Sequence, residues 1–129
     1  MASVTFVQGP LGPTEVPLAP GTGARVEFAG VDRAIEGDGV VASLEYEAFR
    51  PMADRQLREL GAELLATFGL LSISCEHSLG RVAVGAVSFR LVVDAHHNKE
   101  AIAAMSIFID RMKADVAIWK RPIWAGTHE

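Results

Sequence analysis

Two segments with helical periodicity, each preceded by strand-like segments, constrain the fold of this chain most strongly. The first follows Asp54 and the second follows Asn98, and both repeat apolar residues every three or four positions. The repeated residues are Leu57, Leu60, Leu64, Leu65 and Phe68 in the first segment and Ile102, Met105, Ile109 and Met112 in the second. Asp54 is expected to cap the first helix and Gly69 to end it. Each helix therefore has one apolar face that must be covered.

Strand-like segments precede and separate the helices. The apolar patterns predict strands over residues 3–7, 25–29, 40–49, 70–76 and 82–93, with residues 9–23 as an extended loop and 30–39 as an exposed loop. A turn at Leu79-Gly80 is expected to join the last two strands, and residues 117–120 are expected to be extended. In the strand 40–49, one face is predicted to carry Val41, Ser43, Glu45 and Glu47, and the other Ala42, Leu44, Tyr46 and Ala48. This order favours an α+β fold, a mostly antiparallel sheet with two helices packed on one face.

The composition fits one soluble globular domain spanning residues 1–129. The chain has 129 residues, 50% apolar and 22% charged, which is enough to bury a core without cross-links. The longest mostly apolar run, residues 101–109, is too short to cross a bilayer, and the N-terminus lacks the basic-then-apolar order of a signal peptide. The one cysteine, Cys75, excludes an intramolecular disulfide and is expected in the core. We therefore expect a cytoplasmic protein.

The distribution of charge points to a small anionic ligand. The net charge is −4 and no block is rich in lysine or arginine, which argues against a general nucleic-acid surface. The last third nevertheless gathers five basic residues, namely Lys99, Arg111, Lys113, Lys120 and Arg121. A local basic cluster in an acidic chain suggests a specific anion, and the alternative is a solvated helix face.

Lys113 and Lys120 are the leading candidates for chemistry. They are seven residues apart and lie on either side of the expected end of the second helix, with Trp119 as an apolar wall beside Lys120. A lysine whose pKa is lowered by an apolar pocket or a second cation can act as a base or nucleophile. The alternative is that both lysines only interact with the negative end of the helix dipole.

Other polar residues could bind anions. His96 and His97 lie where a strand meets a helix start, and they could hold an anion, cap the helix at the surface, or take part in a metal site. Arg33, in a glycine-rich loop, could pair with phosphate or be an exposed arginine. The chain lacks a phosphate-binding loop with lysine, a Gly-x-Ser-x-Gly elbow and a His-Glu-x-x-His helix.

The pattern as a whole resembles the catalytic, large subunit of molybdopterin synthase. The resemblance runs from Arg25 to Arg121. It rests on Phe28-Ala29-Gly30-Val31-Asp32-Arg33, Leu44-Glu45-Tyr46-Glu47-Ala48-Phe49, Met52, His77-Ser78-Leu79-Gly80, Ala95-His96, Lys113 and Val116-Ala117-Ile118-Trp119-Lys120. Each piece alone is common, and their order along the chain is specific.

This resemblance implies an α/β hammerhead fold, a homodimer, and a heterotetramer with a small partner. The family enzyme adds two sulfurs to cyclic pyranopterin monophosphate in molybdenum cofactor biosynthesis. Each sulfur arrives as a thiocarboxylate on the C-terminal Gly-Gly of a ubiquitin-like small subunit. The reaction is a sulfurtransferase reaction in which the pterin is substrate and product, so neither a bound cofactor nor a metal is expected.

The resemblance also implies roles for particular residues. Lys113 and Lys120 match the family's two active-site lysines, so residues 114–129 would form an active-site tail. Arg33 and His96 match its anion-binding arginine and histidine, and pocket walls are expected from Phe28, Met112 (or Met105) and Trp119.

Three positions depart from the family pattern. His97 and Ser78 stand where arginine is usual, and Pro122 stands where glutamate is usual. Two fewer arginines predict weaker phosphate binding unless a protonated His97 or Arg121 replaces their charge. Two alternative functions follow: a non-catalytic homologue that binds the small subunit as scaffold or regulator, and a domain that binds another small anion.

Overall fold

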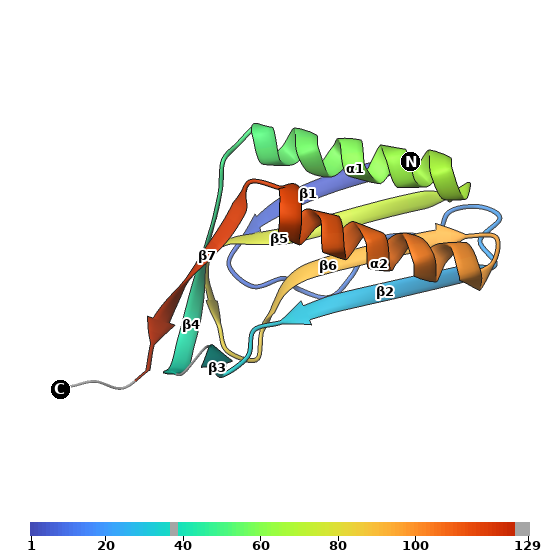
Figure 1. Ribbon diagram of the computed structural model, residues 1–129. Coiled ribbons are helices and arrows are strands. Elements are labelled where there is room, and N and C mark those ends of the chain that lie inside the picture. The colour runs from blue at the N-terminus through green and yellow to red at the C-terminus, as the bar shows by residue number, and fades with distance from the viewer. Residues whose placement is uncertain (37–38, 126–129) are drawn as a thin grey trace.

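The computed structural model describes residues 1–36 and 39–125, which form seven strands and two helices. The elements are β1 (Ala2–Gln8), β2 (Ala24–Val31), β3 (Ile35–Glu36), β4 (Gly39–Ala48), α1 (Met52–Phe68), β5 (Ser72–Ala83), β6 (Val87–Ala95), α2 (Asn98–Asp115) and β7 (Ile118–Trp124). Both helices lie side by side over one face of the strands β1, β5, β6 and β2 (Figure 1). In the described part of the chain, neither helix is long and apolar enough to span a membrane.

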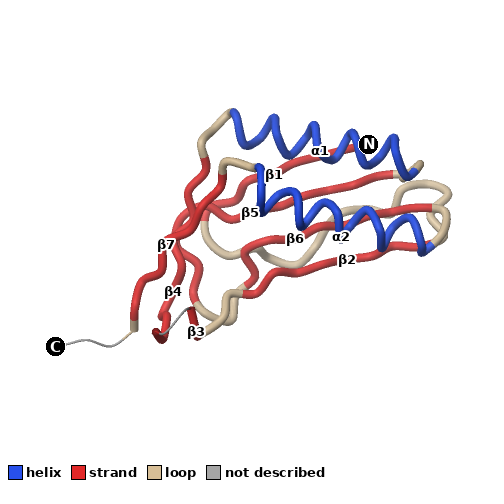
Figure 2. Tube along the Cα trace, in the orientation of Figure 1, coloured by secondary structure: helices blue, strands red, loops and turns tan. Residues whose placement is uncertain are grey.

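The strands form two connected parts. In the first, β6 pairs antiparallel with β2 and β5, and β1 pairs with β5 in parallel. In the second, β4 pairs antiparallel with β3, β5 and β7, and these strands stand at the end of the molecule where α2 gives way to β7 (Figure 2). The predicted α+β class, with a mostly antiparallel sheet and two helices on one face, is confirmed.

Strand β5 joins the two parts, and here the predicted turn at Leu79-Gly80 is wrong. The strand continues through Gly80, whose φ of 78° bends the backbone in a region that glycine adopts without strain. Its partners change at this bend, because β1 pairs up to Leu79 and β4 pairs from Gly80 onward. The turn to β6 comes later, at Gly85.

Three local predictions are wrong. The pairing of β4 with β7 shifts register between Val41 and Ser43, so strict alternation does not hold: Val41 packs with Leu44 and Tyr46, which were predicted on the other face. Within the predicted loop 30–39, residues 30–31 belong to β2, residues 35–36 form β3 and residue 39 begins β4, while residues 37–38 lie outside the described part of the chain. Asp54 does not cap α1, which has Pro51 at that position, and instead pairs with Arg50.

The main core lies between the helices and the sheet. It contains Leu57, Leu60 and Leu64 of α1, as predicted, while Gly69 ends that helix in a left-handed conformation. The buried stripe of α2 is rotated from the prediction: Ile102 is 54% exposed, and the buried residues are Ala101, Ala104, Met105, Phe108 and Met112. The small side chains of Ala101 and Ala104 let α2 approach the sheet closely. A prediction based on large apolar residues does not include them. Cys75 is buried in this core as predicted, and burial raises the pKa of its thiol.

Candidate active site

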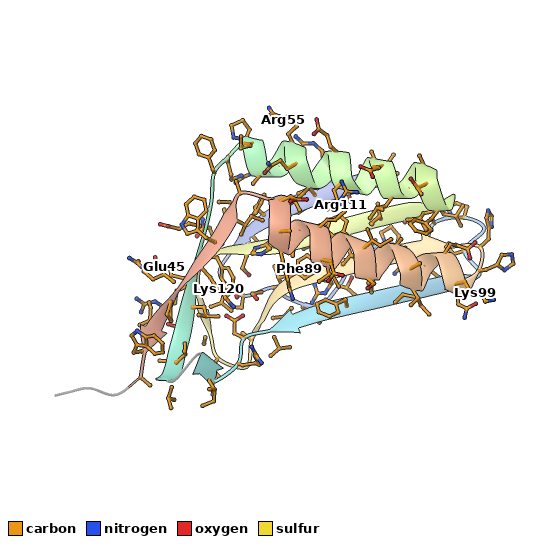
Figure 3. The ribbon with its side chains drawn as sticks, viewed as in Figure 1. Glu45, Arg55, Phe89, Lys99, Arg111 and Lys120 are labelled. Atoms are coloured by element: carbon orange, nitrogen blue, oxygen red, sulfur yellow. The ribbon has the colours of Figure 1, made fainter. Side chains whose placement is uncertain are left out.

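A cavity of about 590 Å³ lies where the C-terminal end of α2 meets β2, β4 and β7. Figure 3 shows Lys120 at this end of the molecule and Lys99 at the opposite end of α2. The cavity is lined by cationic, aromatic and buried polar side chains contributed by segments far apart in the sequence.

Three cations line the cavity. Lys113 occupies the last turn of α2, next to the buried Met112. The chain then becomes extended at Val116, and β7 pairs with β4 so that Lys120 lies opposite Tyr46. Arg33, just beyond β2, lines the same cavity. The predicted lysine pair and the predicted arginine therefore share one site.

The apolar wall contains the three predicted residues Phe28, Met112 and Trp119. The rings of Phe28 and Phe89 are 5.9 Å apart between centroids and tilted by 54°. Trp119 is oriented by a hydrogen bond of 2.9 Å from its Nε1 to Glu47 Oε1. Met105, the alternative to Met112, belongs to the core instead. Aromatic walls beside cations suit a planar anionic ligand.

The floor of the cavity is polar and was not predicted as a site. Asp32 is only 4% exposed, and its Oδ1 accepts hydrogen bonds of 2.7 Å from the hydroxyls of Tyr46 and Ser88. The buried ring of His77 packs edge-on against Tyr46, with centroids 5.3 Å apart. Asp32 was assigned to an exposed loop, and its burial follows from tertiary packing that the local sequence pattern does not reveal.

A comparison with models of protein families identifies the family of this chain. Residues 9–115 match the model of the MoaE protein family. The chain belongs to the MoaE family. Among its curated relatives, the molybdopterin synthase catalytic subunit of Staphylococcus carnosus is 36% identical over 83% of this chain and 71% of the relative. The human protein of that name is 34% identical over 90% of this chain and 65% of the relative.

The lengths of the relatives differ from that of this MoaE-family chain. It spans 29% of the Drosophila willistoni relative, which is 38% identical, and 54% of the Arabidopsis thaliana relative. Among solved structures, molybdopterin synthase from Staphylococcus aureus matches with a TM-score of 0.81 and 28% identity over 93% of this chain and 92% of that chain. A complex of subunits 1 and 2 of molybdopterin-converting factor from Helicobacter pylori, at 22% identity and a TM-score of 0.76, shares the fold and covers 95% of this chain and 89% of that chain.

Two histidines predicted to bind anions do not line the cavity in this MoaE-family chain. His97 is the N-cap of α2 and His96 lies against Gly21 and Gly23, whereas Lys113 lies in the last turn of the same helix. At about 1.5 Å per residue, the 15 residues from Asn98 to Lys113 span about 22 Å. Among residues 1–36 and 39–125, no three His, Cys, Asp or Glu side chains are grouped to hold a metal ion.

Arg121 also lies outside the cavity lining. It follows Lys120 in a strand, where neighbouring side chains point to opposite faces, and its guanidinium donates to Glu45 Oε1 at 2.7 Å. The Glu45 carboxylate raises the pKa of Arg121, mainly through this hydrogen bond. Arg121 is therefore not placed to replace a missing arginine in the cavity of the same chain.

The other two departures from the family pattern lie away from the cavity lining. Ser78 is fully buried and its hydroxyl donates to the carbonyl oxygen of Gly9 at 2.6 Å. Pro122 lies in β7 opposite Leu44. Neither Ser78 nor Pro122 is among the residues that line the cavity.

Proposed function

We propose that this chain is the catalytic subunit of a molybdopterin synthase. It transfers sulfur from the C-terminal thiocarboxylate of a ubiquitin-like small subunit to cyclic pyranopterin monophosphate. The observation that carries the proposal is the convergence of Lys113, Lys120 and Arg33 on one cavity with aromatic walls. Both reactants are anions, and fixed cations in a partly enclosed site stabilise them more than water does.

The sulfur chemistry requires no cysteine nucleophile from this chain, because the thiocarboxylate carries the sulfur. Cys75 is fully enclosed in the core and its raised pKa keeps it a thiol, which excludes it as a sulfur carrier. The lysines stabilise the negative charge that develops when the sulfur attacks, and they transfer protons as the phosphate ring opens. Lys113 is the candidate for a transient covalent bond to the partner's tail.

A homodimer would account for His96 and His97. If these side chains bind the same anion as the lysines, they must come from another copy of the chain, because the length of α2 separates them within one copy. A dimer with two such cavities would bind two small subunits as a heterotetramer. We propose that this assembly acts in the cytoplasm.

A reconstituted reaction tests the proposal. The chain is mixed with the thiocarboxylated small subunit and cyclic pyranopterin monophosphate, and dithiolene formation is followed together with loss of the thiocarboxylate. The expected result is two equivalents of thiocarboxylate consumed for each molybdopterin formed. Binding of the small subunit without any pterin conversion would contradict the proposal and favour a scaffold or regulator.

A further inference from the structure

The floor of the cavity accepts hydrogen bonds and does not donate them. The hydroxyls of Tyr46 and Ser88 donate their protons to Asp32 Oδ1, each at 2.7 Å. The two hydroxyl oxygens are 3.0 Å apart. A buried carboxylate thus fixes the direction of its two neighbours' hydrogen bonds.

His77 adds an acceptor that opens on the cavity. Its Nδ1 is 2.8 Å from the carbonyl oxygen of Ser78, which can only accept, so Nδ1 carries the ring proton. Burial lowers the pKa of the imidazole and keeps it neutral, which leaves a lone pair on Nε2. Within the described residues Nε2 has no hydrogen-bond partner, yet it is not among the fully enclosed unpartnered atoms, which are Thr14 Oγ1 and Asp32 Oδ2. His77 lines the cavity, so Nε2 is the ring atom with which a bound ligand could hydrogen-bond.

Asp32 Oδ2 is itself an acceptor without a partner among the described residues. Leaving one oxygen of a buried carboxyl group unsatisfied is unfavourable, and a ligand with N–H groups would relieve this cost after a small rotation of the carboxyl group brings the enclosed oxygen to the cavity. Two acceptors without partners therefore belong to one floor beneath aromatic walls.

We propose that His77 and Asp32, held in place by Tyr46 and Ser88 and with them here called the acceptor floor, receive the N–H edge of a planar nitrogen heterocycle. The anionic group of the same ligand would lie toward Arg33, Lys113 and Lys120, which line the cavity with the floor. This inference rests on the proposed function and deepens it, because a pterin carries an amino group and a ring N–H on one edge. The acceptor floor recognises the heterocycle, and the three cations bind its phosphate.

The test compares two heterocycles that differ at this edge. Pterin has a 2-amino group where lumazine has a carbonyl, and neither carries phosphate. Calorimetry or Trp fluorescence is expected to show wild-type protein binding pterin at least about 10-fold more tightly than lumazine, since a carbonyl facing an acceptor cannot hydrogen-bond. Equal affinities for the two compounds would overturn the proposal.

Three variants test whether the preference for pterin over lumazine depends on the acceptor floor. His77→Phe keeps an aromatic ring beside Phe6 and Phe89 but removes the acceptor, so it should lose the preference for pterin. His77→Gln keeps an acceptor and should retain the preference within about threefold. Asp32→Asn replaces an acceptor by a donor and should also lose it. Circular dichroism, expected to be unchanged in all three variants, checks the fold, and binding of inorganic phosphate, expected to be unchanged in the two His77 variants, checks the cations.

The outcomes separate this inference from the proposed function. Persistence of the wild-type preference in both His77→Phe and Asp32→Asn would overturn the acceptor floor, whatever the sulfur-transfer activity. A floor-dependent preference in a protein that transfers no sulfur would support the floor and contradict only the proposed function. Lys120→Ala should weaken phosphate binding and leave the ratio of pterin to lumazine affinity unchanged.

Discussion

The Arg25–Asp94 ion pair joins the second half of the loop of residues 9–23 to the sheet. The guanidinium of Arg25 contacts both carboxylate oxygens of Asp94, at 2.7 and 2.9 Å, and donates to the carbonyl oxygens of Val16 and Pro17. The Asp94 side chain is 0% exposed, so its charge depends on this partner. The sequence predicted the extended loop but gave no sign of the residue that fixes it.

Arg25→Ala should lower the free energy of unfolding by about 3 kcal/mol at pH 7, because it leaves a buried carboxylate unpaired. Hydrogen bonding to Arg25 lowers the pKa of Asp94 from 3.8, so this stability is present above that value and is lost as the pH falls further. Urea denaturation should therefore show the difference from wild type shrinking below pH 4. Arg50→Ala, which breaks an exposed pair, should cost less than about 1 kcal/mol. A stability difference between Arg25→Ala and wild type that grows below pH 4 would contradict this role of the ion pair.

Position 78 tests whether the missing family arginines can simply be restored. Ser78→Arg should lower the free energy of unfolding by more than about 2 kcal/mol, because it forces a charge into a fully buried site and removes the bond to Gly9. His97→Arg, at an exposed position, should change stability by less than about 0.5 kcal/mol. Urea denaturation measures both. A Ser78→Arg protein with wild-type stability would refute this assignment.

The candidate residues found from sequence fall into two groups. Lys113, Lys120 and Arg33 were found because the resemblance matched them to functional positions, and the structure brings them into one cavity. Without the resemblance, a helix-dipole role was the favoured interpretation of the two lysines, and an exposed position in the loop was an equal alternative for Arg33. Asp32 could not be found, because its importance comes from contacts with β4 and β6, which the sequence around it does not encode.

At the scale of elements, the bend in β5 allows one strand to serve both parts of the sheet. Gly80, which follows Leu79, was interpreted as part of a turn, since turns and bends use the same positive φ. Only the partners distinguish the two, and β1 and β4 lie far away in the sequence. The helices were easier to predict, because their apolar periodicity is local.

Gly80→Val should lower the free energy of unfolding by about 2 kcal/mol or more, since a β-branched residue is strained at a φ of 78°. A side chain there would also meet Gln8 Oε1 at 2.9 Å. Gly12→Ala, with nothing within 4 Å of its added Cβ, is the matched control and should be nearly neutral. Urea denaturation of both variants measures the difference, and equal stabilities would mean that the bend does not require glycine.

At the scale of the whole molecule, the cavity and the histidines lie at opposite ends of α2. A dimer that shares its sites makes a specific prediction for mixed subunits. Lys120→Ala and His96→Ala proteins should each be inactive, and co-refolding them in equal amounts should restore about a quarter of wild-type activity, because half of the dimers are mixed and each has one intact site. No recovery in mixed dimers, verified by two different affinity tags, would place His96 outside the shared site.

The central claim is that Lys113 and Lys120 form one catalytic site, and the rate of dithiolene formation by their alanine variants tests it most directly. Both variants should lose at least about 100-fold in rate, because fixed charge and proton transfer each contribute on that scale. Their unfolding should match wild type, since both side chains are exposed. Arg55→Ala, which removes an exposed cation from α1 outside the cavity lining, should react at the wild-type rate. Rates for Lys113→Ala and Lys120→Ala equal to that of Arg55→Ala would contradict the account.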